Sequence, residues 1–171
     1  ATSLREALGR RHLLLPGLHA ISSRRGWITP GALGYLCERL HVPPAEAYGV
    51  ASFYALFSLA ERPPRVLHVC DDLACHAAGA PHLAEALGDA GDASATWLRS
   101  PCLGLCEHAP AVMLTEAGAP PRAVAWGPTR IEECRAALAG QVPEASPAWQ
   151  PCVPQLATAR AELSLLRRVG Q

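Results

Sequence analysis

Apolar residues recur at helical spacing through the first third of the chain, residues 1–60. Thr29 and Pro30 are typical of the start of a helix, and the apolar residues after them fall three or four positions apart. These residues are Leu33, Leu36, Cys37 and Leu40. A second stretch opens with two prolines and continues with similar spacing through Ala47, Val50, Tyr54 and Phe57. The pattern predicts an N-terminal helical segment over residues 1–60.

After residue 60 the pattern changes to short strand-like runs that alternate with helices. The runs "RVLHVC", "ATWLRS", "AVMLTE" and "RAVAWG" are typical of strands. The runs "CHAAGAPHLAEALG" and "TRIEECRAALAG" indicate helices, the second with a capping box at Thr129 and Glu132 and a closing Gly140. The order β-α-β-β-β-α predicts a mixed α/β (α+β) domain over residues 61–140. Residues 141–171 are expected to form a Pro-rich linker and a short helix.

Composition and charge exclude several classes of protein. The chain has 171 residues, of which 50% are hydrophobic and 18% charged, so a buried core is expected. Fifteen basic residues, all of them Arg, balance fifteen acidic ones, and we expect no binding of nucleic acid. No apolar run approaches the ~20 residues of a membrane span, so no direct membrane insertion is expected. An odd number of cysteines, seven, and no visible export signal indicate the reducing cytoplasm.

Four of the cysteines form two close pairs, Cys70 with Cys75 and Cys102 with Cys106. Neither pair has the C-x-x-C spacing of a thiol–disulfide oxidoreductase. A structural zinc site takes four thiolates and suits the second pair, although the first pair is wide for it. A [2Fe-2S] cluster needs two thiolates for each iron, which two separate loops provide. The spacing favours the cluster and leaves a zinc-stabilised interaction module as the alternative.

Residues next to these cysteines in the sequence are expected to influence the site or to lie beside it without binding. Gly104 lies between the second pair, where a side chain would crowd the bound group, although an ordinary turn glycine fits equally well. The flanking acids are expected to be solvated and to lower the reduction potential of a bound cluster; they are Asp71, Asp72 and Glu107. The flanking histidines are not needed as ligands, because four thiols complete the site; they are His68, His76 and His108.

The remaining cysteines and the aromatic residues of the first segment are assigned to other roles. Cys37 and Cys134 fall on apolar helical faces and are expected in the core, while Cys152 in the linker has no assignable role. The aromatic residues around position 50 could contact a partner, but their spacing is more typical of a core; they are Tyr48, Phe53 and Tyr54.

Four segments together resemble a known family, the thioredoxin-like [2Fe-2S] subunit that accompanies an NADH-oxidising flavoprotein. The segments are "GWITPGAL", "AYGVASFYALFSL", "VCDDLACHAAGAPHL" and "CLGLCEHAPAVML", and the resemblance covers about residues 4–140. The family includes the subunit designated E in bacterial NADH:quinone oxidoreductase (complex I), the gamma subunit of NAD-dependent formate dehydrogenases and a diaphorase subunit of NAD-linked hydrogenases. The resemblance implies a helical segment followed by a thioredoxin-like domain. It also implies a larger complex that contains an FMN- and NADH-binding flavoprotein partner.

By the same resemblance, the cluster ligands are expected to be Cys70, Cys75, Cys102 and Cys106. Single electrons would be exchanged near the flavin of the partner subunit. The chain has neither a G-x-G-x-x-G nor a P-loop motif, so we expect no bond chemistry from it alone.

Two features depart from the family's pattern or extend it. The 26 residues between Cys75 and Cys102 are fewer than the family leads us to expect, which leaves the surface between these two cysteines in doubt. The closing "LLRRVGQ" resembles the lead-in to the flavoprotein subunit. We therefore expect the chain to be the front part of a fused protein, or to derive from a lineage in which the two proteins are joined.

Overall fold

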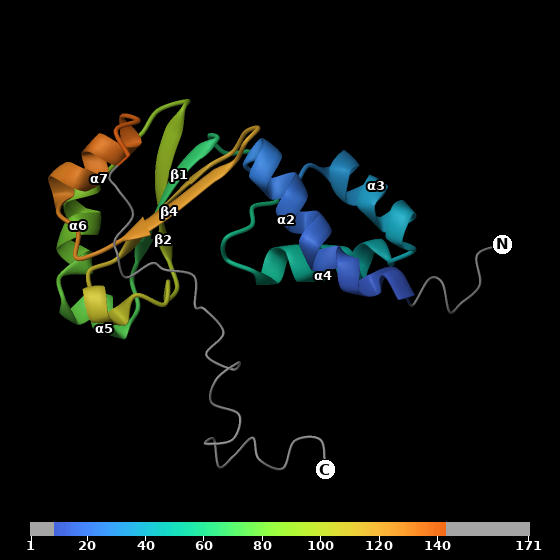
Figure 1. Ribbon diagram of the computed structural model, residues 1–171, viewed down its shortest axis with the longest axis horizontal. Helices are drawn as coiled ribbons and strands as arrows, with labels where there is room; N and C mark the ends of the chain where they lie inside the picture. Colours follow the sequence, from blue (N-terminus) through green and yellow to red (C-terminus); the bar gives the residue numbers. More distant parts are fainter. Residues whose placement is uncertain (1–8, 143–171) are drawn as a thin grey trace, which may run out of the picture.

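The computed structural model describes residues 9–142, in which a group of N-terminal helices lies beside a four-stranded sheet (Figure 1). The helical elements are η1 (Arg11–Leu13), α2 (Leu14–Arg25), α3 (Pro30–Leu40), α4 (Pro44–Phe53), α5 (Leu73–Ala77), α6 (Ala80–Leu87), η2 (Cys106–His108) and α7 (Ile131–Leu138). The strands are β1 (Arg65–Cys70), β2 (Ala95–Ser100), β3 (Val112–Glu116) and β4 (Arg122–Trp126). Within residues 9–142, no helix is both long enough and apolar enough to cross a membrane.

The N-terminal helices form where the apolar spacing predicts them. The Thr29 hydroxyl oxygen accepts a hydrogen bond from the Ala32 amide at 3.1 Å and caps α3, as expected. The predicted inner face of α3 is buried at Leu33, Cys37 and Leu40. These side chains pack with residues of α2 and α4 in a core of their own.

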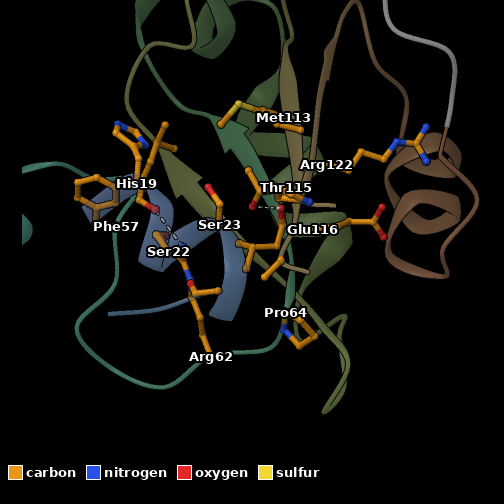
Figure 2. Close-up of a pocket in the computed structure, with 16 residues that line it drawn as sticks. His19, Ser22, Ser23, Phe57, Arg62, Pro64, Met113, Thr115, Glu116 and Arg122 are labelled. Carbon is orange, nitrogen blue, oxygen red and sulfur yellow. Dashed lines mark hydrogen bonds between the residues drawn. The ribbon is translucent and has the colours of Figure 1, made fainter. Parts of the chain in front are cut away.

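The four strands have the order β2-β1-β3-β4 and confirm the predicted mixed α/β (α+β) class. Strands β1 and β2 are parallel, while β3 is antiparallel to both β1 and β4. Helices α6 and α7 cover one face of the sheet and bury a core that includes Leu67, Leu114 and Trp126 (Figure 1). The opposite face points toward α2. Between this face and α2 lies a cavity of about 280 Å³, lined by residues such as His19, Met113 and Thr115 (Figure 2).

Three details of the predicted elements are corrected by the structure. The single helix expected over residues 75–88 is two helices, because Gly79 adopts a left-handed conformation (φ 99°) between α5 and α6. Glu133, not Glu132, caps α7, since its carboxylate accepts from the Arg130 amide and from the Thr129 hydroxyl, both at 3.1 Å. Helix α4 ends at Phe53, so Tyr54 lies beyond it.

The segment boundaries 1–60, 61–140 and 141–171 stay predictions. The linker, its helix, Cys152 and the closing "LLRRVGQ" motif lie outside the described residues.

Gly127 permits a close approach of two backbone segments. A Cβ atom at this position would lie 2.0 Å from the carbonyl oxygen of His108 and 3.1 Å from that of Pro110. The absence of a side chain at Gly127 therefore lets the end of β4 pack directly against the loop that carries Cys106. By contrast, no atom outside the helix backbone lies within 4 Å of a Cβ built on Gly34, which is half-buried in α3.

We expect Gly127→Ala to lower the free energy of unfolding by about 2 kcal/mol, because two backbone carbonyls must move to admit the methyl group. Gly34→Ala is the matched control and should raise stability by about 0.5–1 kcal/mol through better helix propensity. Urea unfolding of both variants measures the difference. If Gly127→Ala has the same free energy of unfolding as the wild type, the loop accommodates the methyl group without cost.

His68 is a buried titratable side chain on the sheet face opposite α6 and α7. It is 1% exposed, and its Nε2 lies 3.3 Å from the Thr115 hydroxyl oxygen. Burial, and secondarily the charge of Arg62, lowers the pKa of His68 from 6.5 to about 4. The imidazole is therefore neutral in the folded protein at neutral pH.

The lowered pKa of His68 predicts a loss of stability in mild acid. The unfolded chain takes up this proton near pH 6.5, whereas the folded chain takes it up only near pH 4. The contribution of neutral His68 to the free energy of unfolding is complete above pH 6.5. It decreases by up to about 3 kcal/mol as the pH falls from 6.5 to 4. Urea unfolding at several pH values should show a smaller acid-side slope for His68→Gln than for the matched variant His82→Gln, which changes an exposed side chain on α6. If His68→Gln retains the full slope, another group causes it.

Candidate functional site

The four paired cysteines line one cavity at the edge of the sheet where β1 and β2 end. Cys70 is the last residue of β1, and Cys75 lies in α5 just after it. Cys102 follows the end of β2, and Cys106 begins η2. Because β1 and β2 are parallel, with Cys70 paired to Ser100, their ends bring the two loops together. A cavity of about 220 Å³ contacts all four cysteines, which the sequence places in two distant segments.

One pair, Cys70 and Cys75, is buried. Their side chains are 1% and 2% exposed. The Ala111 amide donates to the Cys75 sulfur at 3.4 Å, and the Ala111 carbonyl accepts from the Cys70 amide at 3.1 Å. Burial raises the pKa of the Cys75 thiol to about 11, in spite of the Ala111 hydrogen bond. A cation that binds this sulfur must therefore displace its proton.

The other pair, Cys102 and Cys106, is exposed. Their sulfur atoms lie 3.5 Å apart, and the Gly104 amide donates to the Cys102 sulfur at 3.4 Å. The hydrogen bond and charge interaction with Cys102 raise the pKa of Cys106. Gly104 has φ 77°, in the left-handed region that glycine adopts without strain. No atom lies within 4 Å of a Cβ built there, so the structure ties Gly104 to backbone conformation.

The acids beside the cysteines have specific partners that the sequence alone does not reveal. Asp71 contacts Arg99 at 2.5 Å and His76 at 3.4 Å, and the Arg99 hydrogen bond is the main cause of its lowered pKa. Asp72 caps α5 by accepting from the Leu73 amide at 2.8 Å, and it lines the cavity. The expectation of simply solvated acids is therefore wrong for Asp71. Sequence reasoning misses Arg99 because only the parallel pairing of β1 and β2 brings it near Asp71.

The cavity lining contains no histidine; it consists of Cys70, Asp72, Leu73, Ala74, Cys75, Cys102 and Cys106. In residues 9–142, no three or more His, Cys, Asp or Glu side chains converge closely enough to hold a single metal ion. The thiols are instead arranged as one buried and one exposed pair.

Two further cysteines occupy the cores, as their helical positions predict. Cys37 belongs to the core of the N-terminal helices, and Cys134 packs between α7 and the sheet. Burial raises the pKa of both thiols.

The aromatic residues around position 50 are exposed, which contradicts the expectation that they lie in the core. Phe53 is 81% exposed, and Tyr48 and Tyr54 are exposed as well. A hollow of about 210 Å³ separates Tyr54 and its neighbours from the loop that carries Cys102. Leu73, beside the buried pair, is 87% exposed. Exposed apolar side chains therefore lie beside both cysteine loops, Leu73 at the first and Tyr54 across the hollow from the second.

Comparisons with known proteins identify the family of the chain. The model of the family described as thioredoxin-like [2Fe-2S] ferredoxin matches residues 2–120, which is more than half of the chain. Subunit 2 of the NADH-quinone oxidoreductase of Thermus thermophilus is 32% identical over 117 residues, covering 63% of this chain and 65% of that relative. The subunit designated E in the NADH-quinone oxidoreductase of Pseudomonas aeruginosa is 30% identical over 111 residues, covering 60% of this chain and 67% of the relative.

A solved structure has a similar fold. The crystal structure of an NAD+-reducing [NiFe]-hydrogenase in the air-oxidised state matches with a TM-score of 0.55 and 26% identity. The match covers 83% of this chain and 25% of the hydrogenase chain. The matched part of the chain thus spans about two thirds of the length of these curated relatives and a quarter of the length of the hydrogenase chain.

The sequence motifs, the mixed sheet and the family match all lead to one assignment. The chain belongs to the thioredoxin-like [2Fe-2S] ferredoxin family, and its cofactor is the [2Fe-2S] cluster that gives the family its name.

Proposed function

We propose that Cys70, Cys75, Cys102 and Cys106 bind one [2Fe-2S] cluster, and that the chain is an electron-transfer subunit or domain of an NADH-linked oxidoreductase. The observation that carries the proposal is that two separate loops bring two thiol pairs to one cavity. A cluster with two irons needs two thiolates for each iron, which matches a paired donor set. When bound, such a cluster accepts and donates one electron at a time.

The residues around the thiols suit this role. The amides of Ala111 and Gly104 donate to one sulfur of each pair, and such hydrogen bonds stabilise negative charge on the sulfurs. The buried pair anchors the site in the sheet, while the exposed pair reaches the surface. Electrons would therefore enter and leave on the side of Cys102 and Cys106.

The partner in this proposal is an FMN- and NADH-binding flavoprotein subunit within a larger, cytoplasmic oxidoreductase complex. The names of the relatives, NADH-quinone oxidoreductase and NAD+-reducing hydrogenase, support a partner that handles NADH. The exposed apolar residues beside the cysteine loops suit burial against another subunit; they include Phe53, Tyr54 and Leu73. Such contact would bring the exposed cysteine pair near the flavin.

The first test of the ligand set is spectroscopic. Protein purified without oxygen should be red-brown, contain two irons and two sulfides per chain, and bleach with dithionite. Alanine substitution of any one of the four cysteines should remove the visible absorbance and most of the iron. Cys37→Ala and Cys134→Ala should keep the full chromophore, since both thiols lie in the cores. A colourless protein with one tightly bound zinc would support the interaction module instead.

The second test concerns the charge of Asp72, the one acid that lines the cavity. Removing its charge while keeping its capping oxygen, as in Asp72→Asn, should raise the reduction potential by on the order of 20–50 mV, because negative charge opposes the added electron. Asp89→Asn is the matched control. Asp89 lies before β2, at the end of the sheet far from the cysteines, and this change should leave the potential unaltered. A redox titration that finds equal potentials for wild type and Asp72→Asn would show that this carboxylate does not influence the cluster.

A further inference from the structure

We infer that Cys102 and Cys106 form a reversible redox-modification site, at which a small-molecule disulfide such as oxidised glutathione closes an intramolecular disulfide bond when the two thiols bind no metal. Formation of this bond requires only the two thiols and an oxidant. Its effect on cluster binding rests on the proposed function, which it deepens.

The geometry of the exposed pair is close to that of a disulfide. The two sulfurs lie 3.5 Å apart, and a disulfide bond is about 2.05 Å long, so the atoms need to approach by about 1.5 Å. Both side chains are exposed, and they belong to a loop and a short 3-10 turn rather than to the sheet. Gly104 lies between them in a left-handed conformation, and the space beside it is open. Rotation of the two side chains and a small shift of this loop are therefore sufficient to bring the sulfurs to bonding distance.

The reaction is a two-step thiol–disulfide exchange. The Cys102 thiolate, which accepts the Gly104 amide hydrogen bond, attacks one sulfur of oxidised glutathione. The glutathione S–S bond breaks, one glutathione thiolate leaves, and a mixed disulfide remains on Cys102. The Cys106 thiolate then attacks the Cys102 sulfur, forms the intramolecular bond and releases the second glutathione. Two protein thiols lose two electrons and two protons, and one oxidised glutathione becomes two reduced molecules.

The buried pair is protected from the same reaction. The side chains of Cys70 and Cys75 are 1% and 2% exposed, so a molecule the size of glutathione has no access to either sulfur. Cys75 is also fixed by the Ala111 amide and by its place in α5. Oxidation by an external disulfide therefore begins at the exposed pair and ends there.

The consequence is control over cluster binding. A bond between Cys102 and Cys106 removes both sulfurs of one pair, which leaves only two of the four proposed ligands. A dithiol reductant reverses the bond and restores the site. The modification thus protects the exposed thiols from irreversible oxidation while the site is empty.

The distribution of arginines makes the inference testable by peptide mapping. The chain has no Lys, and cleavage after Arg65, Arg99 and Arg122 separates the pairs. Cys70 and Cys75 fall in residues 66–99, and Cys102 and Cys106 fall in residues 100–122. A bond within the exposed pair lowers the mass of residues 100–122 by two hydrogen atoms, whereas a bond between the pairs joins the two peptides.

The experiment treats the full chain with oxidised glutathione after its metal has been removed anaerobically by a chelator. Remaining thiols are then alkylated in urea, the chain is digested with trypsin, and the peptide masses are measured by mass spectrometry. We expect the internal bond in residues 100–122 and two alkylated thiols in residues 66–99. Dithiothreitol should reverse the bond, and Cys106→Ser should instead retain one glutathione on Cys102. Cys37→Ser is the control and should behave as wild type.

Three results would overturn the inference: both exposed thiols remain free, either one is joined to another peptide, or the buried pair oxidises as readily as the exposed one. Oxidation in urea provides the reference in which the buried pair is accessible and should react. The cluster-loaded chain distinguishes the two proposals. If it forms the bond as fast as the metal-free chain, these thiols are not ligands and the proposed ligand set fails, while the modification site stands.

Discussion

The parallel pairing of β1 and β2 is the constraint on which the site depends. Parallel strands end at the same edge of a sheet, and the register sets Cys70 opposite Ser100. The first cysteine loop leaves from the end of β1 and the second from the end of β2, so the loops meet although many residues separate them. The same pairing sets Arg99 opposite Val69, which brings its guanidinium to Asp71. A shift in this register would dismantle both the thiol site and its charge environment.

Burial divides the site into two unequal halves. Cys70 and Cys75 lie beneath the surface and are held by Ala111, the residue immediately before β3. Cys102 and Cys106 lie on an exposed loop whose path requires a left-handed Gly104. In the proposed function, the buried half would give the cluster a rigid attachment, and the exposed half would give it access to a partner. The same exposure makes the outer thiols vulnerable to oxidants whenever no metal holds them.

The short connection between the two loops is well ordered by local hydrogen bonds. One carboxylate oxygen of Asp92 accepts from the Ser94 amide, the Ser94 hydroxyl and the Ala95 amide at 2.6, 2.7 and 3.0 Å. These bonds turn the chain directly into β2. The 26 residues between Cys75 and Cys102 therefore accommodate both α6 and β2, because a compact turn joins these two elements.

The sequence by itself determined the class of fold, the strands, the capped helix α3 and the two cysteine pairs that are proposed as ligands. These features depend on local physics, namely the periodicity of apolar residues, the chemistry of caps and the affinity of paired thiols for metal. Only the tertiary structure decided which pair is buried, that Arg99 neutralises Asp71, and that Phe53 and Tyr54 face outward. It also divided one predicted helix into α5 and α6 and moved the cap of α7 to Glu133. Burial and charge pairing arise between segments far apart in the chain, so no local pattern of residues can specify them.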